Sequence, residues 1–126
     1  AELLARIRRD RASTIYAPAF GREIEQPIAG AIPVRPEARV VITEGNYLLL
    51  DTPPWREVSA QIDENWYCAT ESSVRVGRLV GRHVQFGKAP DSAHRWVEEV
   101  DEVNARLVER SAWRADVTVD MARLSR

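Results

Sequence analysis

The sequence contains one run, Val40-Val41-Ile42-Thr43-Glu44-Gly45-Asn46-Tyr47-Leu48-Leu49-Leu50, in which β-branched apolar residues stop abruptly at an acid and a glycine. This composition is typical of a strand that is buried on both faces and surfaces at its carboxyl end. Open α/β sheets bind their ligands at that edge. Because burying an unpaired charge is costly, Glu44 must be hydrated, paired or bound to a cation. The alternative is an ordinary strand end with a solvated carboxylate.

The residues that follow this run predict a βαβ unit. Asp51-Thr52-Pro53-Pro54 reads as a turn, and its prolines favour the first turn of a helix through Trp55, Val58 and Ile62. Trp66–Ala69 then reads as a second strand, in which the single cysteine, Cys68, is expected to be buried as a small hydrophobe. A strand, a helix and a strand within this length imply parallel pairing with a right-handed crossover.

The rest of the chain supplies helices and one more strand. Apolar spacing predicts a short amphipathic helix over Glu2–Arg9, a helix over 72–86 that ends at Gly87, and a long helix over 91–110. Residues 115–121 read as a last strand. A non-periodic segment, 14–23, reads as a structured loop, and prolines limit 28–34 to a short edge strand. The fold class is therefore α/β, with a small parallel sheet flanked by helices and residues 1–126 forming a single domain.

Composition excludes several classes of function. The chain has 126 residues, is 44% hydrophobic, and carries a net charge of -1 because its 18 basic and 19 acidic residues nearly cancel. This balance favours neither a nucleic-acid partner nor a membrane surface. One cysteine excludes an internal disulfide, and the two histidines, His83 and His94, lack the partners of a zinc site. With no signal peptide or apolar span in the sequence, a reduced cytoplasmic setting is the default expectation.

Three arginines form the second informative pattern. Arg75, Arg78 and Arg82 recur at three and four residues, which places their guanidinium groups along one face of a helix. Forked guanidinium groups suit phosphate oxygens, so a phosphate-facing helix is the specific hypothesis. The alternative is a solvated basic face with a carboxylate nearby, such as Glu71 or Asp91. His83 lies on the apolar stripe, where a packing role is more common than acid-base chemistry.

Taken together, five segments resemble a known superfamily. They are Tyr16-Ala17-Pro18-Ala19-Phe20-Gly21-Arg22-Glu23, Glu44-Gly45-Asn46-Tyr47-Leu48-Leu49-Leu50-Asp51, Arg78-Leu79-Val80-Gly81-Arg82-His83, the Trp96 helix with Asp101 and Asn104-Ala105, and Arg114-Ala115-Asp116. The chain resembles the P-loop kinases of the uridine kinase, phosphoribulokinase and pantothenate kinase superfamily, above all the bacterial branch named fructose transport system kinase. The resemblance covers nearly the whole chain in order.

The resemblance implies a role for each matching residue. Glu44 would help to hold Mg²⁺ near the phosphates of ATP. Arg75, Arg78 and Arg82 would be lid arginines that close over the phosphates. Asn104 would face the nucleotide. The pocket for a small-molecule hydroxyl acceptor would be lined by Tyr16, Arg22, Asn46 and Tyr47, although Gly21 stands where relatives carry an acid.

One expected motif is absent from the sequence. The Walker A pattern, two glycines with four residues between them followed by Lys and Ser or Thr, occurs nowhere in the 126 residues. The resemblance is therefore to the carboxyl-terminal portion of such a kinase, without the amino-terminal strands. Three hypotheses follow: the acceptor and lid part of a kinase that is inactive alone, a non-catalytic module that binds a phosphorylated metabolite or a protein partner, and a homo-oligomer that associates through an exposed sheet edge.

Overall fold

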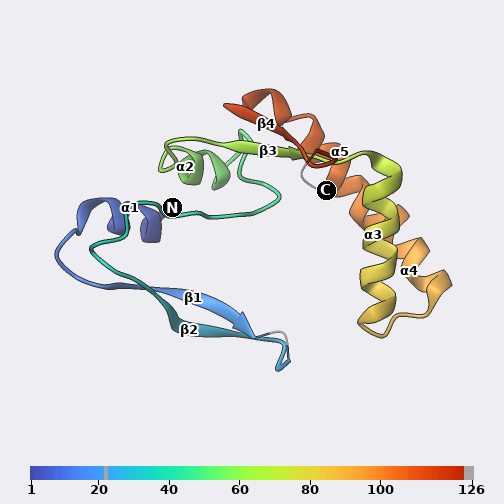
Figure 1. Cartoon of the computed structure of the whole chain (residues 1–126), viewed down its shortest axis with the longest axis horizontal. Coiled ribbons are helices and arrows are strands. Elements are labelled where there is room, and N and C mark those ends of the chain that lie inside the picture. The colour runs from blue at the N-terminus through green and yellow to red at the C-terminus, as the bar shows by residue number, and fades with distance from the viewer. Residues whose placement is uncertain (22, 124–126) are drawn as a thin grey trace.

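The computed structural model describes residues 1–21 and 23–123 of the chain. The architecture is α/β, with a parallel sheet flanked by helices, as the sequence predicts (Figure 1). The elements follow in this order: α1 (Glu2–Arg9), β1 (Ile15–Gly21), β2 (Gln26–Val34), α2 (Trp55–Ser59), β3 (Trp66–Ala69), α3 (Ser72–Gln85), α4 (Pro90–Trp96), the π-helical turn η1 (Val97–Asp101), α5 (Glu102–Glu109), the 3₁₀ turn η2 (Ala112–Arg114) and β4 (Val117–Asp120).

The parallel sheet consists of β3 and β4. Trp66 pairs with Val117 at one end of the ladder and Ala69 pairs with Asp120 at the other. Both strands were predicted from the sequence and both are confirmed. The expected burial of Cys68 is wrong, because Cys68 is exposed on the same face of β3 as Trp66, and no described element covers that face.

The helices between β3 and β4 form the crossover, and we call residues 72–109 the helical unit. The predicted helix over 72–86 is confirmed as α3, and Gly87 follows it with a φ of +95°, a left-handed conformation that glycine adopts without strain. The predicted helix over 91–110 is confirmed as α4, η1 and α5, which run on without a break. Ala93 and Val97 are buried against α3, so this unit has a small core of its own.

A β-hairpin replaces the predicted loop over 14–23. β1 and β2 pair antiparallel over most of their length, with a bulge opposite Pro18 where Gly30 has a φ of +64°. The loop prediction is therefore wrong, and β2 is longer than the predicted short edge strand. Both strands contain prolines, which the pairing tolerates because each strand of a two-stranded sheet is an edge strand, and the bulge lies opposite Pro18.

The predicted strand over 40–44 is also not formed. Residues 38–45 have no regular secondary structure, and no described residue forms a strand ladder with them. Val40 is 76% exposed and Ile42 is 88% exposed, so the expected burial on both faces is wrong for this chain. The physical reason is the lack of a neighbouring strand, because an extended segment counts as a strand only when its backbone is paired. The predicted βαβ unit is therefore incomplete, and its helix is limited to α2.

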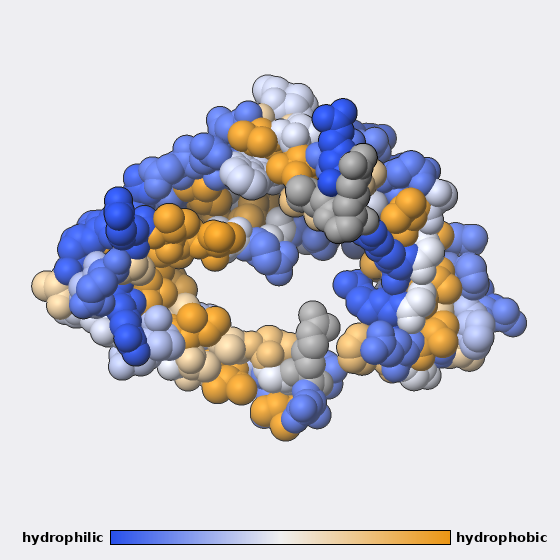
Figure 2. Space-filling view, in the orientation of Figure 1, coloured by the Kyte–Doolittle hydropathy of each residue, from blue (hydrophilic) through white to orange (hydrophobic). Residues whose placement is uncertain are grey.

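The described chain is open rather than compact. Figure 1 shows the hairpin below, the helical unit to one side and the parallel sheet above, and Figure 2 shows an opening between them that apolar side chains border in part. Only four apolar residues of the described chain are buried: Ile15, Leu49, Ala93 and Val97. We call the hairpin and the segment that follows it, residues 15–45, the strand unit. Its apolar side chains are largely uncovered.

Candidate functional site

The arginine face of α3 lies directly beyond the carboxyl end of β3. Glu71 caps the helix by accepting from the backbone N–H groups of Ser73 and Val74, at 3.0 and 3.2 Å. Its carboxylate also accepts from the Ser73 hydroxyl, and this hydrogen bond is the largest cause of a pKa for Glu71 below the usual value. The cap fixes where α3 begins, and therefore which way its arginines face.

An open hollow follows this face. Its lining consists of Thr70, Arg75, Arg78, Leu79 and Arg82. Arg78 and Arg82 are exposed, and within the described residues neither guanidinium has a hydrogen-bond or ion-pair partner. Two like charges four residues apart repel each other slightly, so the face is electrostatically suited to an anion.

Arg75 differs from the other two arginines because it is already paired. Its Nε and Nη2 atoms donate to Oε1 of Glu102 at 3.1 and 2.8 Å, and Nη2 also donates to Oε2 at 3.0 Å. Both side chains are largely covered, at 27% and 20% exposure. The alternative from the sequence, a carboxylate near the basic face, thus holds for Arg75, although the carboxylate is Glu102 rather than Glu71 or Asp91.

A second contact ties α3 to the same helix. Nε2 of His83 lies 2.8 Å from Oδ2 of Asp101, and the imidazole meets the Trp96 ring edge-on. This agrees with the packing role expected for His83. Asp101 ends the π-helical turn η1 and Glu102 begins α5, so two successive carboxylates face α3. Apolar periodicity predicts the helix but gives no signal for this turn, and sequence reasoning therefore missed Glu102.

The structure brings together two of the predicted site residues that are far apart in the sequence. The Tyr47 hydroxyl donates to Oδ1 of Asn104 at 2.9 Å, which ties the turn after Glu44 to α5. The Tyr47 ring also packs against Trp55 with a centroid distance of 5.5 Å. Asn46 precedes Tyr47 in the same turn and is exposed.

Glu44 fits part of a magnesium site. Its side chain is exposed, and no described residue forms a hydrogen bond or ion pair with it. The described residues contain no group of three or more His, Cys, Asp or Glu side chains that could hold a metal. Mg²⁺ commonly takes only one or two protein carboxylates and completes its shell with water and phosphate oxygens. Glu44 is therefore suited to be one ligand of a metal that arrives with a nucleotide.

The two remaining residues predicted for the acceptor pocket belong to the hairpin. Tyr16 lies on β1 and is 59% exposed. Arg22 lies outside the described residues. Figure 1 shows the hairpin well separated from α3, so in this chain the predicted acceptor side and the arginine face are apart.

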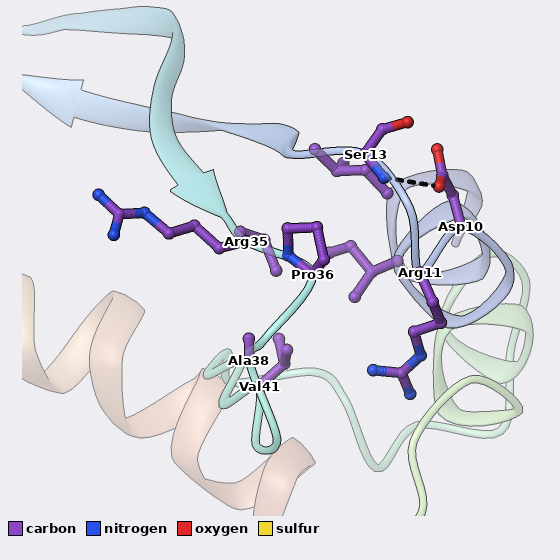
Figure 3. A pocket seen from close by; sticks show the side chains of 10 residues that line it. Asp10, Arg11, Ser13, Arg35, Pro36, Ala38 and Val41 are labelled. Atoms are coloured by element: carbon purple, nitrogen blue, oxygen red, sulfur yellow. Dashed lines mark hydrogen bonds between the residues drawn. The ribbon is translucent and has the colours of Figure 1, made fainter.

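A second, very small cavity lies between α1 and the base of the hairpin (Figure 3). It is barely large enough for a water molecule. Asp10 accepts at its edge from the backbone N–H of Ser13, and the guanidinium groups of Arg11 and Arg35 point away from the cavity. The cavity is a packing defect rather than a ligand site.

The combination of a parallel α/β sheet and an arginine face beyond its carboxyl edge is typical of proteins that handle phosphorylated ligands. No family model matches the sequence. The chain is 34% identical over 112 residues to a Schizosaccharomyces pombe protein described as a uridine kinase, a match that spans 87% of this chain and 48% of the relative. It is 39% identical over 80 residues to an ATP-dependent kinase-like protein of Aspergillus versicolor, with 64% of this chain and 46% of the relative covered.

A solved structure agrees with these sequence matches. The crystal structure of a protein from Silicibacter sp. TM1040, described as a fructose transport system kinase, aligns with a TM-score of 0.81 and 35% identity over 94% of this chain and 56% of that chain. The chain is therefore a relative of the uridine kinase-like P-loop kinases, as its sequence motifs indicate. It spans about half the length of the proteins that it matches. No helix in the described ranges is both long enough and apolar enough to cross a membrane.

Proposed function

We propose that the chain is the acceptor and lid portion of an ATP-dependent small-molecule kinase, which transfers a phosphoryl group to a hydroxyl of a sugar, nucleoside or pantothenate-like alcohol. One observation carries the proposal. Arg78 and Arg82 are exposed and unpaired within the described chain, beside a hollow at the carboxyl end of β3. The matches to kinase-like relatives support the same conclusion.

Each site residue then has a role that its chemistry allows. Arg78 and Arg82 bind the phosphate oxygens and stabilise the charge that develops during transfer. Glu44 supplies a carboxylate to the magnesium ion that neutralises the phosphates. Asn104 and Tyr47, held together by their hydrogen bond, position α5 against the turn after Glu44. Tyr16, Arg22 and Asn46 contact the acceptor once the hairpin lies over the site.

The chain by itself is proposed to be inactive. A Walker A loop supplies the backbone amides and the lysine that cradle the phosphates, and the 126 residues contain none. The exposed run Val40–Ile42 and the edge of β3 that does not pair with β4 offer two places for further strands. We propose that strands of a portion carrying the phosphate loop complete the sheet there.

The test is calorimetric titration with Mg-ATP of the chain alone and of a version extended upstream by a segment that carries a Walker A loop. The expected result is binding and phosphoryl transfer by the extended protein only. Replacing both Arg78 and Arg82 by Gln in the extended protein is expected to lower the affinity for Mg-ATP about tenfold or more, since charge-assisted hydrogen bonds are lost. An extended protein that binds no nucleotide contradicts the kinase proposal.

A second candidate function is a non-catalytic module that binds a phosphorylated metabolite. The observation that favours it is that the arginine pair is available in a chain without a phosphate loop. In this case the 126-residue chain alone binds a sugar phosphate, and the upstream extension adds neither affinity nor turnover.

A further inference from the structure

We propose that Glu102 is a built-in counter-ion that holds Arg75 away from the anion site, so that the site of the resting chain consists of Arg78 and Arg82 alone. The inference rests on the proposed function, because it assumes that the arginine face binds phosphate groups. It concerns which of the three arginines bind an anion in the resting chain.

The first step is the contrast between the three side chains. All three line the same hollow, yet only Arg75 is bound through both its Nε and Nη2 atoms by a carboxylate. A carboxylate held by two parallel N–H donors occupies the same donor atoms that a phosphate group would use. Glu102 therefore stands in the place of a ligand for Arg75, while the guanidinium groups of Arg78 and Arg82 stay open.

The second step is the geometry that presents Glu102. Successive side chains of a helix point about 100° apart, so two neighbouring acids meet different parts of a partner helix. The wider turn η1 ends at Asp101, and both Asp101 and Glu102 reach α3 from there. π-helical turns of this kind are frequent at functional sites.

The third step is that the Arg75–Glu102 and His83–Asp101 contacts are independent of each other. Asp101 binds His83, which lies eight residues beyond Arg75 on α3 and therefore roughly 12 Å along the helix. Lys88 also lies over the Trp96 ring at 4.3 Å. Because these contacts hold the far end of α3, neutralising Glu102 releases the Arg75 side chain without detaching the helix.

The consequence is a limit on the number of arginines that a phosphate ligand can contact. An anion with several phosphate groups has enough acceptor oxygens for three arginines, but in the resting chain it finds only Arg78 and Arg82 open. An anion with one phosphate group reaches only the open pair. The pairing of Arg75 with Glu102 thus limits the affinity for polyphosphates, and removing Glu102 makes all three arginines available.

The experiment is calorimetric titration of the 126-residue chain with tripolyphosphate at low ionic strength, for the wild type, Glu102→Gln and the matched control Glu99→Gln. Glu99 lies one turn earlier on the same helix and is exposed, and no described side chain pairs with it, so its replacement removes the same charge without freeing an arginine. We expect Glu102→Gln to bind tripolyphosphate about three- to tenfold more tightly than Glu99→Gln. Equal or weaker binding by Glu102→Gln overturns the inference.

The double variant R75Q/E102Q gives an independent readout that does not require a gain in affinity. It removes the pair without changing the net charge, and we expect its affinity for tripolyphosphate to stay within about twofold of the wild type. A loss of about tenfold shows instead that Arg75 is a direct ligand in the resting chain, which overturns the inference.

The variant R78Q/R82Q separates this inference from the proposed function. If R78Q/R82Q loses tripolyphosphate binding while Glu102→Gln binds with the same affinity as Glu99→Gln, the arginine face is an anion site and only the proposed role of Glu102 is overturned. If the wild type binds no tripolyphosphate, or if R78Q/R82Q binds as well as the wild type, the inference falls, and the Mg-ATP titration of the extended protein decides the proposed function separately.

Discussion

The helical unit and the strand unit are similar in apolar content but opposite in how they use it. In the helical unit, Ala93 and Val97 are buried, and the Arg75–Glu102 and His83–Asp101 contacts tie α3 to its neighbours. In the strand unit, Ile15 is the only described residue that is buried, and Val40 and Ile42 face solvent. Helices satisfy their backbone hydrogen bonds internally, whereas a strand needs a neighbour. The helical unit therefore has a small core of its own, whereas part of the strand unit has no pairing strand among the described residues.

The largest expected effect comes from charging the core of the helical unit. Val97→Asp places a carboxylate at a position that is 1% exposed, and no described side chain is available to pair with it there. We expect the free energy of unfolding of the helical unit to fall by about 3 kcal/mol. Thermal unfolding followed by circular dichroism measures this loss, and an unchanged midpoint contradicts the description of this unit as packed.

The same kind of substitution, an apolar residue replaced by Asp, is expected to have a different effect in the strand unit. Replacing Val40 and Ile42 by Asp should leave the thermal midpoint of the 126-residue chain unchanged, because both side chains already face water. It should, however, reduce self-association through the exposed apolar strand, which we expect for the wild type at high concentration. Analytical ultracentrifugation over a concentration series checks this. A wild-type chain that stays a monodisperse monomer at high concentration contradicts the prediction of an oligomer.

The cap of the helical unit gives a smaller, pH-dependent effect. Hydrogen bonds from the Ser73 hydroxyl and from backbone N–H groups lower the pKa of Glu71 in the folded chain. The stabilising contribution is therefore present above the pKa of the unfolded state and is lost as the pH falls through the folded value. We expect Glu71→Gln to flatten the loss of helicity of α3 between about pH 5 and pH 3, measured by circular dichroism. Parallel pH profiles for the variant and the wild type rule out this cap effect.

The smallest effect is expected at the surface ion pair that ties α1 to the loop before β3. The Arg8 guanidinium hydrogen-bonds both carboxylate oxygens of Asp63, at 2.7 and 2.8 Å, and lowers the pKa of Asp63. Both side chains are exposed, so solvent screens the pair. We expect Arg8→Gln to raise the pKa of Asp63 toward its ordinary value, as followed by NMR titration, with little change in thermal stability. A pKa for Asp63 that does not move shows that the contact is not populated in solution.

Local pattern was sufficient to predict the elements whose hydrogen bonds are internal or whose partner lies within the chain. The apolar spacing of α1, α3 and the long helix, the aromatic residues of β3 and the β-branched residues of β4 gave the right elements within a few residues. The resemblance to kinases also came from the sequence, because the Glu44–Asp51 run and the arginine pattern can be read without coordinates. Matches to kinase-like relatives then confirmed it.

Two features of the site required the structure. The pairing of Arg75 with Glu102 joins residues 27 positions apart on two different helices, and the apolar periodicity carries no mark of it. The bond between Tyr47 and Asn104 joins residues 57 positions apart, a separation that no local pattern encodes.

The sequence by itself determined the α/β class, most of the helices, the positions of β3 and β4 and the chemistry of the arginine face, since these depend on neighbours within a few residues. Only the tertiary structure decided which arginine is already neutralised, that residues 14–34 form a hairpin, and that the run Val40–Ile42 stays unpaired and exposed. The physical reason is the same in each case. Helix formation and side-chain type are local properties, whereas strand pairing, burial and ion pairing depend on what else is present to meet them.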